Sequence, residues 1–162
     1  TAPLAAAVTL PLTDTLFAAA AQGGSPMAAP PAKFEVFTNQ TIEGLVKSLQ
    51  ATPGTKTLID VAAMPLGLQM GSEEKTPFPE FEFHAHRDHL FLILEGSTRI
   101  EVGGKPEGTH SEAAGQWHAP RSEGATSIAL TKGEMLVVPR MTPHRRATEG
   151  KVVFLIVHAT TT

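Results

Sequence analysis

The sequence predicts an all-β barrel in a single domain. From Thr57 onward, short apolar runs alternate with glycine and proline, which is the pattern of an all-β sandwich or barrel. The chain has 162 residues, of which 41% are apolar, enough to build one hydrophobic core and hardly two. We therefore expect a barrel domain over residues 33–162, preceded by an arm over residues 1–32.

The expected strands follow from the apolar runs and the turn residues between them. The stretch 104–124 has no clear periodicity of apolar residues, so we expect it to be a loop that serves as a lid. Nine strands are expected, over residues 57–64, 66–70, 80–86, 89–95, 98–103, 125–130, 135–139, 143–148 and 151–158.

The N-terminal region predicts one or two short helices. Asp14 can cap a helix that runs through Ala21, and Thr41 can cap a second one. The second helix has an apolar stripe at helical spacing, and Lys33–Phe37 suggests a strand before it. The stripe consists of Ile42, Leu45, Val46 and Leu49. Residues 1–32 have neither the basic start nor the long apolar centre of an intact signal peptide, which fits either a cytoplasmic protein or one secreted to the periplasm or beyond after signal removal.

The segment Glu80–Gly96, EFEFHAHRDHLFLILEG, carries three histidines. On an extended strand Glu82, His84 and His86 share one face, because side chains alternate between the two faces. A two-residue hairpin loop at Arg87-Asp88 would then place His89 opposite His86. This pattern predicts three converging imidazoles.

A second segment, Gly133–His144, repeats the arrangement with a glycine turn, an apolar strand, Pro139 and a histidine. Together the two segments resemble the paired motifs of the cupins. The first cupin motif has a His-x-His pair, a third ligand, six residues and a glycine; the second has a glycine, a proline and a final histidine. Here these positions are His84, His86, His89 and Gly96, then Gly133, Pro139 and His144.

The resemblance implies a double-stranded β-helix, or jelly-roll, barrel with a metal ion held by His84, His86, His89 and His144. Three positions depart from the family pattern. His89 stands where a glutamate is usual, Met141 stands where a glycine is usual, and the spacing from His86 to His89 is one residue short. Imidazole ligands suit one divalent transition metal ion such as Fe, Mn, Ni, Cu or Zn, without selecting among them.

Three functions are compatible with this site. The resemblance to four-histidine cupins implies an oxygen-using, dioxygenase-like oxidoreductase acting on a small organic molecule, or else a metal-dependent lyase or isomerase. There are two alternatives to an enzyme. The protein could bind a metal or small ligand without catalysis, or the metal site could be purely structural. For an enzyme, strand parity makes Glu82 the candidate catalytic base or hydrogen-bond acceptor beside the metal.

Charge and composition limit the classes of molecule that the protein is expected to bind. The net charge of -3 gives no basic surface for nucleic acid, and no apolar run approaches the roughly 20 residues of a membrane span. The absence of cysteine excludes disulfides and thiolate ligands. A small molecule is therefore the expected ligand. The apolar side chains within residues 1–32, and a resemblance to small cupins that pair, predict a homodimer.

Overall fold

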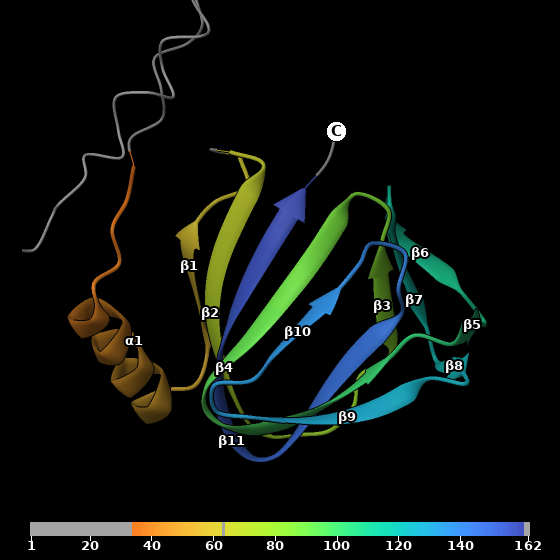
Figure 1. Cartoon of the computed structure of the whole chain (residues 1–162). Coiled ribbons are helices and arrows are strands. Elements are labelled where there is room, and N and C mark those ends of the chain that lie inside the picture. The colour runs from red at the N-terminus through yellow and green to blue at the C-terminus, as the bar shows by residue number, and fades with distance from the viewer. Residues whose placement is uncertain (1–33, 63, 161–162) are drawn as a thin grey trace, which may run out of the picture. The chain divides into compact units, whose positions relative to one another are not determined.

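The computed structural model describes residues 34–62 and 64–160, and this part of the chain folds mainly into antiparallel strands. The strands form the predicted all-β jelly-roll barrel, and a single helix accompanies them in the described residues (Figure 1). The elements are α1 (Asn39–Ala51), β1 (Thr55–Ile59), β2 (Leu66–Thr76), β3 (Phe81–His84), β4 (Arg87–Val102), β5 (Lys105–Glu107), β6 (His110–Ala113), β7 (Gln116–Ala119), β8 (Arg121–Glu123), β9 (Thr126–Thr131), β10 (Met135–Val138) and β11 (His144–Thr160).

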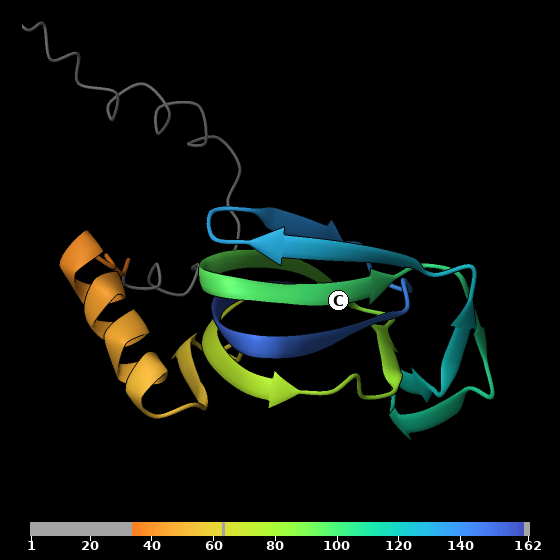
Figure 2. The same cartoon turned by 90° about the horizontal axis from the view of Figure 1, so that it is seen from below.

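Two long strands, β4 and β11, hold the barrel together. They pair antiparallel along almost their whole length, from His144 opposite Val102 to Thr160 opposite Arg87. Both strands curve round the barrel, as Figure 2 shows from below. Each half of the pair carries further strands, so that two sheets form and share β4 and β11.

The first sheet runs β1-β2-β11-β4-β10, using the C-terminal half of β11 and the N-terminal half of β4. The second runs β6-β7-β3-β11-β4-β9 and uses the other halves. Strands β5 and β8 pair separately. Helix α1 lies beside β1 and β2, on the opposite side of the barrel from β5 to β8 (Figure 1).

Gly96 allows the β4–β11 pair to bend. Its φ of 75° lies in the left-handed region, and a Cβ placed there would be 2.0 Å from the carbonyl oxygen of Lys151. The pairing register shifts opposite this point, between Ala147 and Val152. Only glycine combines that backbone conformation with so close an approach of the partner strand.

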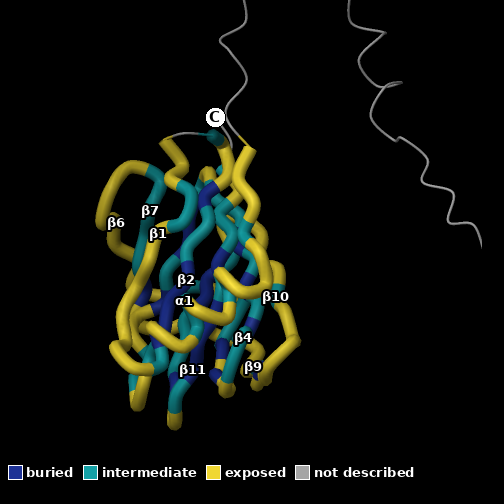
Figure 3. Tube along the Cα trace, turned by 90° about the vertical axis from the view of Figure 1, so that its left-hand side faces the viewer, coloured by how far each residue is buried: buried dark blue, intermediate teal, exposed yellow. Residues whose placement is uncertain are grey.

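The core lies between the two sheets, where the inward faces of β4, β9, β10 and β11 meet (Figure 3). Its buried members are apolar and alternate along each strand, as expected for sheets with one face toward the interior. They are Phe91, Ile93, Ile100, Leu130, Val138, Val152, Phe154 and Ile156.

Helix α1 covers the outer face of the first sheet. The predicted apolar stripe from Ile42 to Leu49 is confirmed, since it packs against Met70 and Val153. The capping residue differs from the prediction: the Thr38 hydroxyl accepts the Thr41 backbone N–H, so the helix begins at Asn39. The sequence offered two threonines three residues apart, and the earlier one takes the N-cap position.

Several strand boundaries differ from the prediction. The expected strands 89–95 and 98–103 form one strand, β4, and 143–148 and 151–158 form one strand, β11. Gly96 suggested a turn, yet it stays paired with Val152 of β11. Strand β11 likewise continues through Gly150. The predicted hairpin at Arg87-Asp88 is also wrong, because the chain bends at residues 85–86 and β4 starts at Arg87.

The predicted strand at Lys33–Phe37 and the predicted loop at residues 104–124 are both absent from the described part of the chain. Residues 34–37 form no strand, Phe34 and Val36 are 91% and 73% exposed, and no strand of the described residues pairs with them. The stretch 104–124 is not an irregular loop; it contains β5 to β8, each three or four residues long, and β7 extends the second sheet from β3. Strands this short show no period. The predicted helix over residues 14–21 and the arm itself lie outside the described residues.

We predict that Gly96→Ala destabilises the protein far more than Gly103→Ala. Both glycines have a φ near 80°, but a Cβ at Gly103 would meet nothing within 4 Å. Gly103→Ala should lower the free energy of unfolding by about 1 kcal/mol, the conformational cost alone. Gly96→Ala should cost at least about 3 kcal/mol because the β4–β11 pair must also separate. Urea denaturation of the two variants measures this, and equal losses would show that the close approach at Gly96 is unimportant.

Candidate metal centre

Three buried histidines meet inside the barrel. His84, His89 and His144 are 5%, 5% and 3% exposed, and one ring nitrogen of each lies within 4.8 Å of the others. The rings of His84 and His89 stack in parallel, with centroids 4.9 Å apart, and His144 stands at a steep angle to both. With this spacing, small side-chain movements would bring all three nitrogens to about 2.0 to 2.1 Å from a single metal ion, the usual distance between a zinc ion and an imidazole nitrogen.

The two sheets bring these histidines together. His84 is the last residue of β3 and His144 is the first residue of β11, with His144 opposite Glu82 of β3. His89 lies on β4 in the other sheet, opposite His158 of β11. The cluster therefore joins the ends of strands from both sheets.

The ring nitrogens that face each other have no hydrogen-bond partner among the described residues. These atoms are His84 Nε2, both nitrogens of His89 and His144 Nε2, all buried. His144 Nδ1 lies 2.9 Å from the Thr142 carbonyl oxygen and donates to it, which leaves Nε2 as a free lone pair. A buried nitrogen without a partner costs roughly 1 to 3 kcal/mol, and a metal ion would relieve that cost. The donor set therefore fits a metal ion.

Burial keeps the three imidazoles neutral. Loss of hydration lowers the pKa of His84 to about 4 and that of His89 to about 2. Burial also lowers the pKa of His144, against the opposing effects of the Thr142 carbonyl and the Glu82 carboxylate. Because imidazole binds metals only in its neutral form, the folded protein presents these ligands ready at neutral pH.

Glu82 places a carboxylate beside two of the three histidines. Its two oxygens lie 3.9 Å from His84 Nε2 and 3.5 Å from His144 Nε2, which are separations found between neighbouring ligands of one ion. Strand parity correctly placed Glu82 on the histidine face. A fourth, anionic donor would offset half the charge of a divalent cation.

His86 lies outside the cluster. Its side chain is exposed, and Gly115 is its close neighbour. The parity argument assumed a strand through residue 86, but β3 ends at His84 and the chain bends at the next two residues. The sequence held a signal: the His86-to-His89 spacing was one residue short, and taking Glu82 and His84 as the paired donors removes that short spacing.

His158 was not predicted as a site residue. It faces the barrel interior from β11, its ring centroid is 4.9 Å from that of His89, and its buried Nδ1 has no partner in the described part of the chain. The remaining histidines, His110 and His118, lie on β6 and β7 and face the carboxylates of Glu80 and Glu112.

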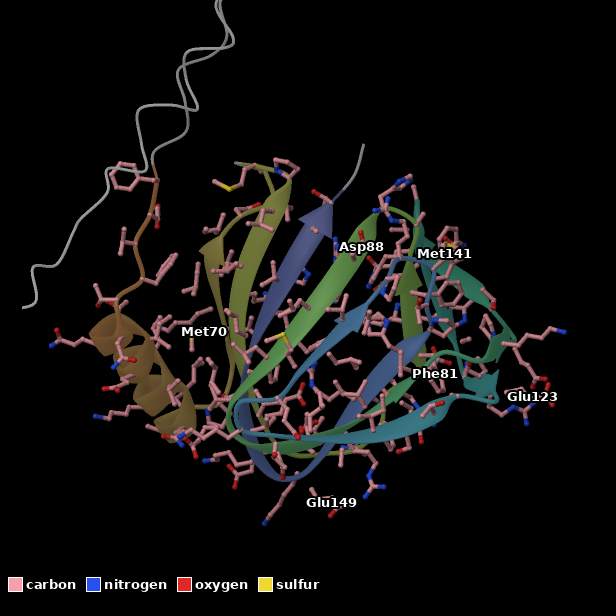
Figure 4. The ribbon with its side chains drawn as sticks, viewed as in Figure 1. Met70, Phe81, Asp88, Glu123, Met141 and Glu149 are labelled. Carbon is pink, nitrogen blue, oxygen red and sulfur yellow. The ribbon has the colours of Figure 1, made fainter. Side chains whose placement is uncertain are left out.

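Met141 explains one departure from the family pattern. Its φ of 61° shows that this position requires the left-handed conformation that glycine adopts most easily. The Met141 N–H donates to the His84 carbonyl at 2.8 Å and so ties the turn before His144 to the end of β3. In Figure 4, Met141 and Asp88 lie at the same end of the barrel as the end of β11. At the same end, Asp88 accepts the backbone N–H and side chain of Arg140.

A small cavity opens beside the cluster. It has a volume of about 120 Å³ and is lined by Glu82 and His144 together with Phe91 and Ile100. Arg146 and Glu73, which are hydrogen-bonded to each other, also line it. A volume of this size fits a small molecule.

Comparison with known proteins gives a likeness of fold. No protein-family model matches the chain, and no curated protein does. Among solved structures, a conserved Streptococcus pyogenes protein of unknown function has a TM-score of 0.49 at 17% identity, covering 70% of this chain and 78% of its own. The cupin domain of Schizosaccharomyces pombe Cnp3 has a TM-score of 0.49 at 16% identity, covering 66% and 60%.

A cupin superfamily protein from Desulfitobacterium hafniense is similar at a TM-score of 0.45 and 17% identity, over 67% of this chain and 79% of its own. Its own strand topology gives the chain a jelly-roll barrel of the cupin type. The two sheets sharing β4 and β11 decide this, with the two motif segments meeting at His84, His89 and His144. The described residues contain no helix that is long and apolar enough to span a membrane.

We predict that the metal-free protein loses stability as the pH falls below about 6.5. The unfolded chain protonates its histidines near that pH, whereas the folded state keeps His84 neutral down to about 4 and His89 to about 2. The unfolded state therefore binds more protons in this window, so the free energy of unfolding decreases from pH 6.5 toward pH 4. Urea titrations of chelator-treated protein at pH 7, 6 and 5 measure it. The variant His89→Gln should show a shallower slope; an identical slope would mean that His89 is not held neutral.

Proposed function

We propose that this protein is a metal-dependent enzyme that acts on a small organic molecule, using a divalent transition metal held by His84, His89, His144 and Glu82. The observation that supports it best is the group of buried imidazole nitrogens without hydrogen-bond partners in the described residues, of which His144 lines a small cavity together with Glu82. A structural site would surround the ion with ligands and leave no space, whereas His144 and Glu82 border a cavity of about 120 Å³. His86, expected as a ligand, is left out of the set because of its exposed position.

The four donors leave room for chemistry. In a six-coordinate site two positions stay open, enough for a bidentate substrate, or for substrate and dioxygen together. When bound, the metal supplies Lewis acidity and, if it is iron, manganese or copper, electron transfer. We favour an oxygen-using, dioxygenase-like oxidoreductase over a lyase or isomerase, because neutral nitrogen donors with one carboxylate suit redox-active late metals.

The residues of the chain have separate tasks in this proposal. Thr142 fixes the tautomer of His144 through the hydrogen bond to Nδ1. Phe91 and Ile100 exclude water from the cavity wall. We assign Glu82 the role of a metal ligand. If its carboxylate dissociated from the ion, it could act as a general base and accept a proton from the substrate, which is the catalytic role expected from the sequence.

The metal content of variants tests the ligand set. We expect His144→Ala to lose most of the bound metal and the accompanying rise in melting temperature, since binding to the native state adds stability. His86→Ala is the matched control and should retain the metal. Elemental analysis of protein purified without an affinity tag gives the result. Equal loss in both variants would restore His86 as a ligand, and no loss in His144→Ala would refute the site.

Oxygen uptake then separates an enzyme from a binding protein. The metal-loaded protein, offered a panel of small hydroxy, oxo and phenolic acids, should consume dioxygen with at least one compound, and His144→Ala should not. Metal that binds and exchanges without any turnover in the panel would favour the non-catalytic alternative.

A homodimer is part of the same proposal. Strand β10 lies at the edge of the first sheet and pairs only with β4 in the described chain, and its Met135 and Val137 are 59% and 58% exposed. An exposed apolar edge of this kind invites a second copy. We expect sedimentation at micromolar concentration to give twice the chain mass. Val137→Lys should shift it to monomer, and a monomeric wild type would contradict the pairing.

A further inference from the structure

Arg87 is the only one of the six arginines without an acidic partner. All six lie in the described part of the chain, and the other five form ion pairs with Asp88, Glu73, Glu101, Glu107 or Glu149. Arg87 is half-buried, and no hydrogen bond or ion pair to it occurs within the described residues. A partly buried guanidinium without an acidic partner in the described residues is available to bind an anion.

The side chain of Arg87 faces the barrel interior. It stands two residues before His89 on β4 and therefore on the same face, and it pairs with Thr160 at the end of β11. Its charge also lowers the pKa of His84, His89 and His158, so the guanidinium lies near all three rings. A divalent ion at the cluster would add further positive charge beside it.

A second cavity lies at this place. It has a volume of about 240 Å³ and is lined by Arg87 and His158 together with Thr57, Gln69 and the backbone of Gly67. Gly67 stands opposite His158 on β2. A Cβ at Gly67 would lie 3.5 Å from the imidazole and only 2.6 Å from the Val61 side chain, so this position of the lining has room for glycine alone. The buried Nδ1 of His158 has no partner among the described residues, and its ring touches that of His89. The cavity thus adjoins the metal donors through a direct ring contact.

We propose that this cavity binds the carboxylate of the substrate, with Arg87 as the charged anchor and His158 as a second polar contact. This rests on the proposed function, which it narrows to a small organic acid. Guanidinium pairs with carboxylate through two parallel hydrogen bonds, and the hydroxyl of Thr57 and amide of Gln69 can satisfy further polar atoms of the ligand. An anion here would also balance the charge that Arg87 and a metal ion bring together.

Asp60 is the one acid in the lining. Its carboxylate accepts the Ala62 N–H at 2.9 Å, and it makes no ion pair with Arg87. If Asp60 swung inward it would compete with the ligand for Arg87. Asp60→Asn should therefore leave anion binding unchanged or tighten it.

The test compares malonate with its uncharged diamide, malonamide, by calorimetry on metal-loaded protein and on the metal-poor His144→Ala variant. The wild type should prefer malonate. Arg87→Gln should weaken malonate binding by at least about tenfold and leave malonamide unchanged, since a charge-assisted hydrogen bond is lost. Arg99→Gln, which removes an equal charge from the exposed pair with Glu149, is the matched control and should have no effect.

The outcomes separate this inference from the proposed function. Malonate binding that depends on Arg87 in both protein forms supports the subsite, even if the metal content proves low. Normal metal content with equal malonate affinity in wild type and Arg87→Gln overturns the subsite alone. No preference of the wild type for malonate over malonamide, or an equal loss in Arg99→Gln, overturns it as well. Melting curves of each variant confirm that it is folded before binding is compared.

Discussion

The antiparallel pairing of β4 with β11 is the constraint on which the rest of the structure depends. Strand β11 has 17 residues, and His144 and His158 stand 14 residues apart on it. On a straight strand these residues would be roughly 46 Å apart, at about 3.3 Å per residue. Yet both rings contact the ring of His89, at centroid distances of 5.1 and 4.9 Å. The strand pair must curve completely round, and the bend at Gly96 and Lys151 lets it do so.

This curvature produces a site that local stability alone would not favour. The barrel interior contains two kinds of polar groups. Arg146, Glu73 and Thr148 hydrogen-bond to one another and are satisfied, whereas the facing nitrogens of His84, His89 and His144 have no partners in the described chain. Burying three neutral imidazoles without hydrogen-bond partners therefore lowers the free energy of unfolding that the apolar core provides. A cost of this kind is expected where residues serve a ligand rather than the fold.

Much of this could be predicted from the sequence, because the relevant signals are local. Alternation placed Glu82 and His84 on one face, and the two motif segments predicted that His89 and His144 would meet them. His86 was misplaced because parity holds only while a strand continues, and the apolar pattern does not reveal that β3 stops at His84. His158 was missed because only the long-range register with β4 brings it to His89. The merging of strands across Gly96 depends likewise on the partner strand, which local patterns do not show.

The central claim is that three histidines and Glu82 hold one metal ion, and a crystal of zinc-loaded protein tests it most directly. Diffraction data on both sides of the zinc absorption edge locate the ion without assumptions about its ligands. The account predicts one anomalous peak at about 2.0 to 2.3 Å from His84 Nε2, His144 Nε2, a ring nitrogen of His89 and a carboxylate oxygen of Glu82. A peak that instead includes His86, or one that lies only at the exposed pair His110 and His118, would contradict it.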